Sequence, residues 1–509
     1  MSVTIQNDKE TAFILYLTEN FIEEMANYLF NADFGGFMSE RFLINFASCA
    51  LAAFLILFGT ASAASGQQKK ENKTQKAFVE FTPLLVNLVR EAAQPLSGDS
   101  RDYDPLLELI GDSRFVMLGE STHGTHEFYR ERARITRRLI EEKGFNAVVL
   151  EADWTDAARV NDYIQGRGSD KTAQKALSGF TRFPRWMWQN TDFADFVNAL
   201  RNINGSRPTQ SETRVGVYGM DLYGLAESID VVINHLKSVD PEAARRARKR
   251  YGCFARFREE PQRYGLEVSN KTTRSCEKEA EQQLQELQQM TANDNSDDDE
   301  SDKKDDLFDA YQNAKVVKSA EAYYRTIYNK RVSSWNLRDK HMFETLVALL
   351  KHLDSTTKEK SKIVVWAHNT HQGDAQATYM AEQGEWNVGQ LIRQQYRKDA
   401  VLVGFTTYAG YVRAASEWDG FDERKRVRPA LEGSYSALFH KTGVPNFLLL
   451  LRDRGKLSEE LSRSALERAI GVIYLPQTER QSHYFYAQIA KQFDAVIHYD
   501  VTSAVKRLY

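Results

Sequence analysis

The chain has 509 residues, 42% of them hydrophobic and 11% aromatic, and a formal net charge of −3. This length and composition allow a large buried core, and the near-neutral charge gives no sign of a nucleic-acid partner. Three cysteines are too few for a disulfide framework or a zinc ribbon.

An apolar segment near the N-terminus has the parts of a secretory signal. Arg41 precedes the apolar run 42–58, and Ala61 and Ala63 stand at the −3 and −1 positions of a small-residue cleavage site. A positive residue, an apolar run and such a site together are typical of a signal peptide. An uncleaved membrane anchor is the alternative, because the run is almost long enough to span a bilayer.

A signal normally begins a protein, and Met38 lies shortly before this one. We therefore predict a non-native extension over residues 1–37, a signal peptide or membrane anchor over 38–63 and a linker over 64–77. The expected location is periplasmic or secreted. With an uncleaved anchor, the protein would contact the membrane only there, and its catalytic domain would lie outside the cytoplasm.

Export would bring Cys253 and Cys276 into an oxidising compartment, where they can form a disulfide. Two free thiols are the alternative.

Beyond the linker, the pattern of apolar runs predicts the fold. A helix is expected over Phe78–Leu96. Strands are expected over Phe115–Leu118, Ala147–Leu150, Arg214–Tyr218, Ile363–Ala367, Ala400–Phe405, Asn446–Leu451, Ala469–Tyr474 and Ala495–Tyr499. Continuous apolar strands that alternate with helices indicate an α/β fold, with a largely parallel central sheet flanked by helices. Ligands bind beyond the carboxyl ends of the strands in such sheets.

One long segment interrupts this alternation within the predicted catalytic domain, residues 78–509. Residues 222–355 are expected to form a helical insertion. Inside it, residues 293–306 are mostly Asp, Ser and Lys, which predicts a disordered acidic loop between two helices.

Polar residues follow several of the predicted strands at the point where each strand ends. They are Glu120, His123, Glu151, Asp221, His368 and His371. Because the carboxyl ends of parallel strands meet at one edge of a sheet, we expect these side chains to share one cleft. A neutral imidazole is well suited to moving protons near pH 7. Polar residues commonly end a strand, which explains any one of these residues but explains the whole set less well.

Two arginines lie on apolar faces of predicted helices. Arg132 shares a face with Phe128, Ile135 and Leu139 at spacings of 4, 3 and 4 residues. A buried guanidinium needs a carboxylate partner, which Glu120 or Glu151 can supply. The alternative is an arginine whose stem packs while its head reaches water.

Arg338 lies in the same way between Trp335 and Met342 on the inward face of a second helix. It is therefore a candidate cation for the same cleft.

No familiar nucleophile motif is present. The segment from Gly119 to His123 lacks the last glycine of G-x-S-x-G, and no H-E-x-x-H occurs. We therefore expect attack by water on a small-molecule ester, with His123 as general base, a role that typically contributes about 10²–10⁴-fold. Glu120 or Glu151 would orient the imidazole, and Arg132 or Arg338 would hold the carbonyl oxygen.

Two other functions remain open. His123, His368, His371, Glu120 and Glu151 carry metal-ligand atoms, although no pair has the spacing of a known metal motif. A metal-dependent hydrolase of peptide or phosphoester bonds is therefore one alternative. An exported binding protein without catalytic activity is the other.

Further residues are candidates for substrate binding around the cleft. Trp186 and Trp188 can wall a pocket for an apolar ligand, but core packing explains them equally well. His483 can flank the cleft or belong to a helix cap, and Asp221 and His371 complete the set.

Several separated motifs resemble the erythromycin esterase family from about residue 80 to the C-terminus. They are G-E-S-T-H-G-T-H-E-F at 119–128, L-E-A-D-W at 150–154, F-P-R-W-M-W at 183–188, W-A-H-N-T-H at 366–371, N-V-G-Q-L at 387–391 and E-R-Q-S-H-Y-F at 479–485.

The resemblance implies hydrolysis of a macrolide lactone by activated water, as in antibiotic resistance, with no required metal or other cofactor. It assigns the base to His123, beside Glu120. Arg132, Glu151, His368 and Arg338 fall at its other functional positions.

Overall fold

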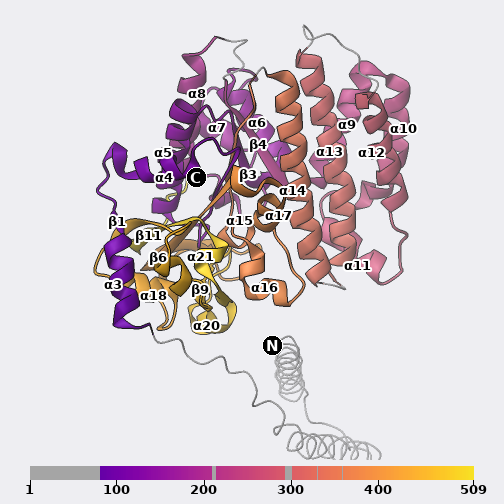
Figure 1. The fold of residues 1–509 in the computed structure, drawn as a ribbon. Coiled ribbons are helices and arrows are strands. Elements are labelled where there is room, and N and C mark those ends of the chain that lie inside the picture. The colour runs from indigo at the N-terminus through magenta and orange to yellow at the C-terminus, as the bar shows by residue number, and fades with distance from the viewer. Residues whose placement is uncertain (1–80, 209–213, 293–300, 329–330, 358) are drawn as a thin grey trace, which may run out of the picture. The chain divides into compact units, whose positions relative to one another are not determined.

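A computed structural model describes residues 81–208, 214–292, 301–328, 331–357 and 359–509 (Figure 1). The predicted extension, signal segment and linker lie outside these residues. Among the residues described, no helix has both the length and the apolar character needed to cross a membrane.

The centre of the fold is a 9-stranded sheet in the order β1-β8-β11-β6-β2-β5-β3-β4, with β7 paired to β6. The bounds are β1 (Gln94–Pro95), β2 (Phe115–Leu118), β3 (Ala147–Asp153), β4 (Gly216–Asp221), β5 (Ile363–Trp366), β6 (Ala400–Ala415), β7 (Asp422–Val427), β8 (Asn446–Leu450) and β11 (Ala495–Thr502). All neighbours from β11 to β4 pair in parallel, whereas β1, β8 and β7 are antiparallel. The predicted α/β fold with a largely parallel sheet is confirmed.

Helices cover both faces of the sheet, because alternate side chains of its apolar strands point to opposite sides. On one face, Val116 and Leu118 of β2 pack with α4 (Asp104–Ile110), α5 (His126–Lys143), α6 (Trp154–Ile164) and α8 (Thr191–Gly205). On the other, Phe115 and Met117 pack with α3 (Pro83–Ala92), α14 (Arg331–Thr356), α17 (Val388–Tyr396) and α18 (Tyr435–His440).

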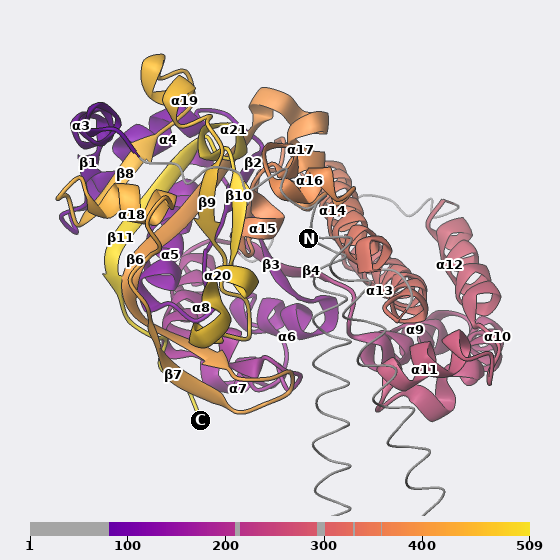
Figure 2. The same cartoon turned by 90° about the horizontal axis from the view of Figure 1, so that it is seen from below.

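The segment between β4 and β5 is a layer of helices with a core of its own. It contains α9 (Leu225–Val239), α10 (Pro241–Tyr251), α11 (Pro261–Ser269), α12 (Glu277–Ala292), α13 (Ser301–Thr326) and α14. Figure 2 shows α14 between the sheet and the other helices of this layer. Cys253 and Cys276 form a disulfide within it, with Cα atoms 6.0 Å apart.

Short elements complete the described chain. They are α7 (Ala173–Leu177), α15 (Asn369–Gln372), α16 (Tyr379–Glu382), α19 (Lys456–Glu460), α20 (Glu479–Ser482), α21 (Ile489–Gln492), the β9–β10 hairpin (Ala465–Arg468 and Tyr484–Ala487) and the 3-10 turns Ser100–Tyr103, Arg185–Met187, Gly252–Phe257, Ala375–Ala377, Arg397–Asp399 and Pro476–Thr478.

The structure corrects two predicted elements. Residues 469–474 form no strand: Ile470 and Ile473 make only isolated bridges, to Thr122 and Ala415. The segment is apolar because Ile470 and Tyr474 fill a small core cluster. The first predicted helix is shorter than expected, because the Thr82 side chain caps α3 and Pro83 begins it.

The prediction of a disordered acidic loop over residues 293–306 is also partly wrong. Helix α13 begins at Ser301, so residues 301–306 are helical, and residues 293–300 lie outside the described residues. In this helical part, Oδ1 of Asp305 lies 2.7 Å from Nε2 of His352 on α14.

Candidate active site

The carboxyl ends of four neighbouring strands bring the predicted residues together. Strands β2, β5, β3 and β4 are adjacent, and His123, His368, Glu151 and Asp221 stand at or just after their ends. All four residues are buried. The sheet topology therefore joins groups that are far apart in the sequence.

His123 is held by an acidic partner from its own loop. Its Nδ1 lies 2.9 Å from Oε1 of Glu120, and Nη2 of Arg132 donates to Oε2 of Glu120 at 2.8 Å. Arg132 is fully buried, with its guanidinium 4.6 Å from the Tyr129 ring and 4.7 Å from the Trp366 ring. Of the two carboxylates considered as its partner, Glu120 is the one in contact.

Backbone contacts fix the loop that carries His123. The carbonyl of Ser121 accepts from Ile470 N–H at 2.8 Å, and the carbonyl of Gly124 accepts from Arg413 N–H at 3.1 Å. A side chain at position 124 would overlap the Arg413 carbonyl oxygen, so this approach requires glycine. The loop is therefore tied to neighbouring segments on two sides.

Glu151 connects the two histidine-bearing segments. Its Oε2 accepts from His368 N–H at 2.9 Å, and its Oε1 accepts from Nη2 of Arg338 at 2.8 Å. Burial raises the pKa of this carboxyl, but the charges of His371, Arg338 and His123 outweigh burial and hold the pKa well below its ordinary value. Glu151 is therefore an anion at neutral pH.

Arg338 binds a second carboxylate, that of Asp221. Its Nε donates to Oδ1 at 3.0 Å and its Nη2 to Oδ2 at 2.7 Å. Burial lowers the pKa of Arg338, but Asp221, Tyr223 and Glu151 raise it well above its usual range. The guanidinium therefore stays charged and is shared between two anions.

His371 has an acidic partner that the sequence analysis missed. Its Nδ1 lies 2.9 Å from Oδ1 of Asp339, and its Nε2 lies 3.1 Å from Nη1 of Arg338. Burial lowers the pKa of His371, but Asp339 and Glu151 raise it more, so the net shift is upward. The sequence did indicate this partner, because Asp339 lies four residues after Trp335 and therefore on the same inward face of the helix.

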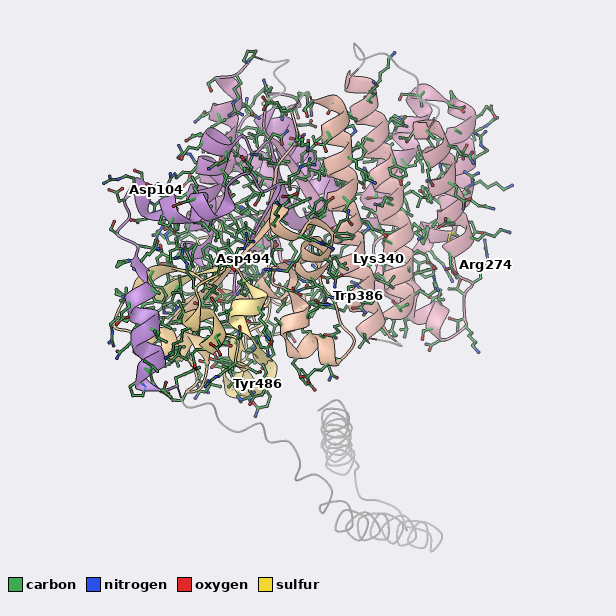
Figure 3. The ribbon with its side chains drawn as sticks, in the orientation of Figure 1. Asp104, Arg274, Lys340, Trp386, Tyr486 and Asp494 are labelled. Atoms are coloured by element: carbon green, nitrogen blue, oxygen red, sulfur yellow. A yellow bond between two sulfur atoms is a disulfide. The ribbon has the colours of Figure 1, made fainter. Side chains whose placement is uncertain are left out.

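Trp335 itself covers the His371 ring. The two ring centroids are 4.6 Å apart and nearly parallel. The indole N–H of Trp335 donates to the carbonyl of Trp386 at 2.7 Å, and Figure 3 labels Trp386, in the segment between α16 and α17.

His368 lies next to His123, with ring centroids 4.8 Å apart. Its Nδ1 accepts from Thr370 N–H at 3.3 Å, so a neutral ring carries its hydrogen on Nε2. Burial and the neighbouring His123 charge lower the pKa of His368 well below its ordinary value. Among the described residues, this buried Nε2 has no close hydrogen-bond partner. It is therefore a donor beside His123, and a hydrogen bond to the backbone of Ser121 raises the pKa of His368 against these two effects.

Three predicted substrate-binding residues lie outside this network. Trp186 and Trp188 are 1% and 5% exposed and belong to the main core, where Trp188 packs on Tyr129. His483 is buried, and its Nε2 accepts from Leu475 N–H at 3.1 Å. In the described part of the chain, no group of three or more His, Cys, Asp or Glu side chains is placed to hold a metal ion.

Fold and network together define an α/β protein with a buried network of imidazoles, carboxylates and guanidinium groups at the carboxyl edge of a parallel sheet. The family model for erythromycin esterase matches residues 140–502, and the chain belongs to this family of hydrolases. Erythromycin esterase type II of Escherichia coli is 23% identical over 435 residues, which cover 80% of this chain and 94% of that protein.

Solved structures share the fold. A crystal structure titled succinoglycan biosynthesis protein aligns with a TM-score of 0.67 and 21% identity over 83% of this chain and 98% of its own. The open conformation of a mutant of the erythromycin esterase EreC aligns with a TM-score of 0.58 and 15% identity, covering 84% of this chain and 98% of that chain.

Proposed function

We propose that this protein hydrolyses a carboxylic ester with a water molecule that His123 activates. The observation that carries the proposal is the chain of contacts from His123 Nδ1 to Glu120 and on to Arg132, at 2.9 and 2.8 Å. A carboxylate on Nδ1 keeps the hydrogen there and leaves Nε2 as the basic nitrogen. Among the described residues, no hydrogen-bond partner occupies that Nε2.

The neighbouring His368 supplies the second function that ester hydrolysis needs. Negative charge develops on the carbonyl oxygen during attack, and a fixed donor in a dry site stabilises it. The Nε2–H of His368 is buried beside the His123 ring, where the backbone of Ser121 is an acceptor that a substrate oxygen would replace. We assign it this role in place of Arg132, which is fully buried behind Glu120, and of Arg338, which already binds two carboxylates.

The proposed reaction has two steps. His123 Nε2 takes a proton from water while the water oxygen attacks the ester carbon, and His368 binds the resulting oxyanion. The tetrahedral intermediate then breaks its bond to the leaving oxygen, which receives the proton from His123. The products are one carboxylic acid and one alcohol, and Glu120 stabilises the imidazolium between the two steps.

A covalent route through the nearby serine lacks support. The Oγ of Ser121 is buried and makes no hydrogen bond among the described residues, so no imidazole is placed to take its proton. Direct attack by water is therefore the better account of this site.

The experiment is mass spectrometry of erythromycin and a panel of simple esters after incubation in H₂¹⁸O. We expect one heavy oxygen in the acid product and a loss of about 10²–10⁴-fold in kcat for His123→Gln. Ser121→Ala is the matched control and should hydrolyse at the unaltered rate. Unimpaired hydrolysis by His123→Gln would overturn the proposal, and so would a covalent acyl-enzyme at Ser121.

A further inference from the structure

Asn369 lies at the junction of three parts of the site. It directly follows His368, and its own N–H donates to the carbonyl of Glu120 at 2.7 Å. Its side-chain amide binds the backbone of Phe405 on β6 in both directions, donating to the carbonyl at 2.9 Å and accepting from the N–H at 3.2 Å. It therefore ties both histidine-bearing segments to the central strand β6.

The approach between these segments is as close as the chain allows. A Cβ atom at Gly119 would overlap Oδ1 of Asn369 and crowd the carbonyl oxygen of Val403. The glycine before Glu120 thus lets the Asn369 amide lie against the loop that carries His123. A small displacement of Asn369 must therefore move that loop as well, because no gap separates them.

Glu467 is the other partner of the Asn369 amide. This residue lies on β9, is 2% exposed, and places Oε1 3.4 Å from Nδ2 of Asn369. No described lysine, arginine or histidine forms an ion pair with it. The adjacent Arg468 is directed elsewhere, since its Nε donates to the Tyr484 hydroxyl at 2.8 Å.

The other groups around Glu467 do not supply a positive charge either. Gln492 of α21 offers its amide, and Tyr435 of α18 is the titratable neighbour, with a pKa that burial raises well above its ordinary value. A carboxylate buried among such groups has lost its hydration and gained no counter-charge, so the neutral acid is favoured. In agreement, burial raises the pKa of Glu467 to about 8.

We propose that Glu467, as a neutral carboxylic acid, and Asn369 are positioning residues that set the separation of the His123 and His368 rings. The proposal rests on the proposed function, in which both rings act on one ester carbonyl. Ionisation of Glu467 would place an uncompensated charge beside the Asn369 amide and draw its Nδ2 away from Phe405. The two histidine-bearing segments would then lose their common anchor on β6.

The first test measures the protonation state of the Glu467 carboxyl group and needs no substrate. The infrared spectrum of the full chain minus that of Glu467→Gln should contain, at pH 6, the carbonyl stretch of a protonated carboxyl group. This band should disappear on alkaline titration with a midpoint near pH 8. Its absence at pH 6 would overturn the proposal whether or not the protein hydrolyses esters.

The second test is the pH profile of kcat with erythromycin, or with another ester that the panel shows to be hydrolysed. We expect the activity of the unmodified protein to fall about tenfold per pH unit above pH 8. Glu467→Gln imitates the neutral acid, so it should keep the rate at pH 7 and lose the alkaline decline. Glu321→Gln replaces a buried carboxyl of the helical layer, and this control should keep the decline.

The amide partner is tested by Asn369→Asp, which removes the donor to the Phe405 carbonyl at nearly constant shape. We expect about a 10²-fold loss in kcat with little change in KM, because misplacement of catalytic groups affects the reaction step. An alkaline decline that persists in Glu467→Gln would overturn the proposal. Failure of every variant and of the unmodified protein to hydrolyse any ester would instead reject the proposed function.

Discussion

The two imidazole–carboxylate pairs of the site are built in different ways. Glu120, His123 and Arg132 come from the end of β2 and the helix α5 that follows it. The pair of His371 and Asp339 joins α15 to α14. It reaches the sheet through Arg338 and through Glu151 of β3, whose Oε1 lies 3.4 Å from Nε2 of His371. The first pair is thus a local structure, whereas the second depends on the helical layer being docked in place.

This difference predicts separate roles for the two pairs, one in the reaction and one in stabilising the fold. In the local pair, the contacts end on His123, the base of the proposed reaction. In the assembled pair, they end on Glu151 and Asp221, two buried anions at the ends of β3 and β4 that both bind Arg338. We therefore expect changes in the first pair to act mainly on turnover, and changes around Arg338 to act mainly on stability.

The largest expected effect is that of Arg338→Met on stability. The change leaves Glu151 and Asp221 buried without their cation, and removal of one partner from a buried ion pair typically costs about 3–5 kcal/mol. Urea unfolding at pH 7 measures the free energy of unfolding. Lys340→Met is the control on the same helix, since the exposed Lys340 (Figure 3) forms an ion pair with the partly exposed Glu344.

The loss caused by Arg338→Met should also depend on pH. The pKa of Glu151 in the folded protein lies below its ordinary value of 4.5, so its contribution is complete above that pH and is lost as the pH falls. Acidification should therefore shrink the difference between variant and unmodified protein. Equal destabilisation by Lys340→Met, or a difference independent of pH, would contradict this account.

The next prediction compares the loss in kcat caused by Glu120→Gln with that caused by Asp339→Asn. Glu120 touches the base directly, so its change should lower kcat by about 10²-fold through misplacement of His123. Asp339 acts on His371, which contacts Glu151 rather than His123 itself, and here we expect roughly a tenfold loss at most. Steady-state kinetics at pH 7 decides the order, and the reverse order would mean that His371 is the essential imidazole.

Nuclear magnetic resonance of the His371 ring provides a second measurement on Asp339→Asn. Asp339 is one of the charges that raise the pKa of His371 against burial. Its loss should lower that pKa, because the protonated ring then has fewer anionic neighbours. An unchanged pKa would show that Glu151 alone sets the charge of His371.

The sequence predicted most of what depends on strand ends and helix faces. Arg132 was placed correctly on a buried face from its spacing alone, because a helix repeats every 3.6 residues. Which carboxylate it would contact was not predictable, since that depends on the order of β2, β5 and β3 in the sheet. Asp339 was not predicted, because an acidic side chain is rarely buried completely, as this one is.

Other parts of the structure depend on tertiary contacts that leave a weak local signal. Strand β7 reads Asp-Glu-Arg-Lys-Arg-Val, and its charged pattern hides a strand that pairs with β6 at the sheet's edge. Trp186 and Trp188 fit a pocket wall and a core equally well, because aromatic side chains serve both uses. Their burial, at 1% and 5% exposure, places them in the core.

The smallest expected effect is that of His483→Gln. His483 lies in a segment that resembles the family, yet its ring accepts from Leu475 N–H, and no contact among the described residues joins it to His123 or His368. Loss of this hydrogen bond should cost about 1 kcal/mol in unfolding free energy and change kcat less than about twofold. Kinetics and urea unfolding at pH 7 measure both.

The stability cost of His483→Gln should change with pH in a defined direction. Burial lowers the pKa of His483 to about 4, so the ring is neutral in the folded protein at pH 5 and mostly protonated when the chain is unfolded. The unmodified protein therefore loses stability as the pH falls from 6.5 towards 4, and the variant escapes that loss. A large fall in kcat with a pH-independent stability difference would instead bring His483 into the site, and the local pair would no longer act alone on turnover.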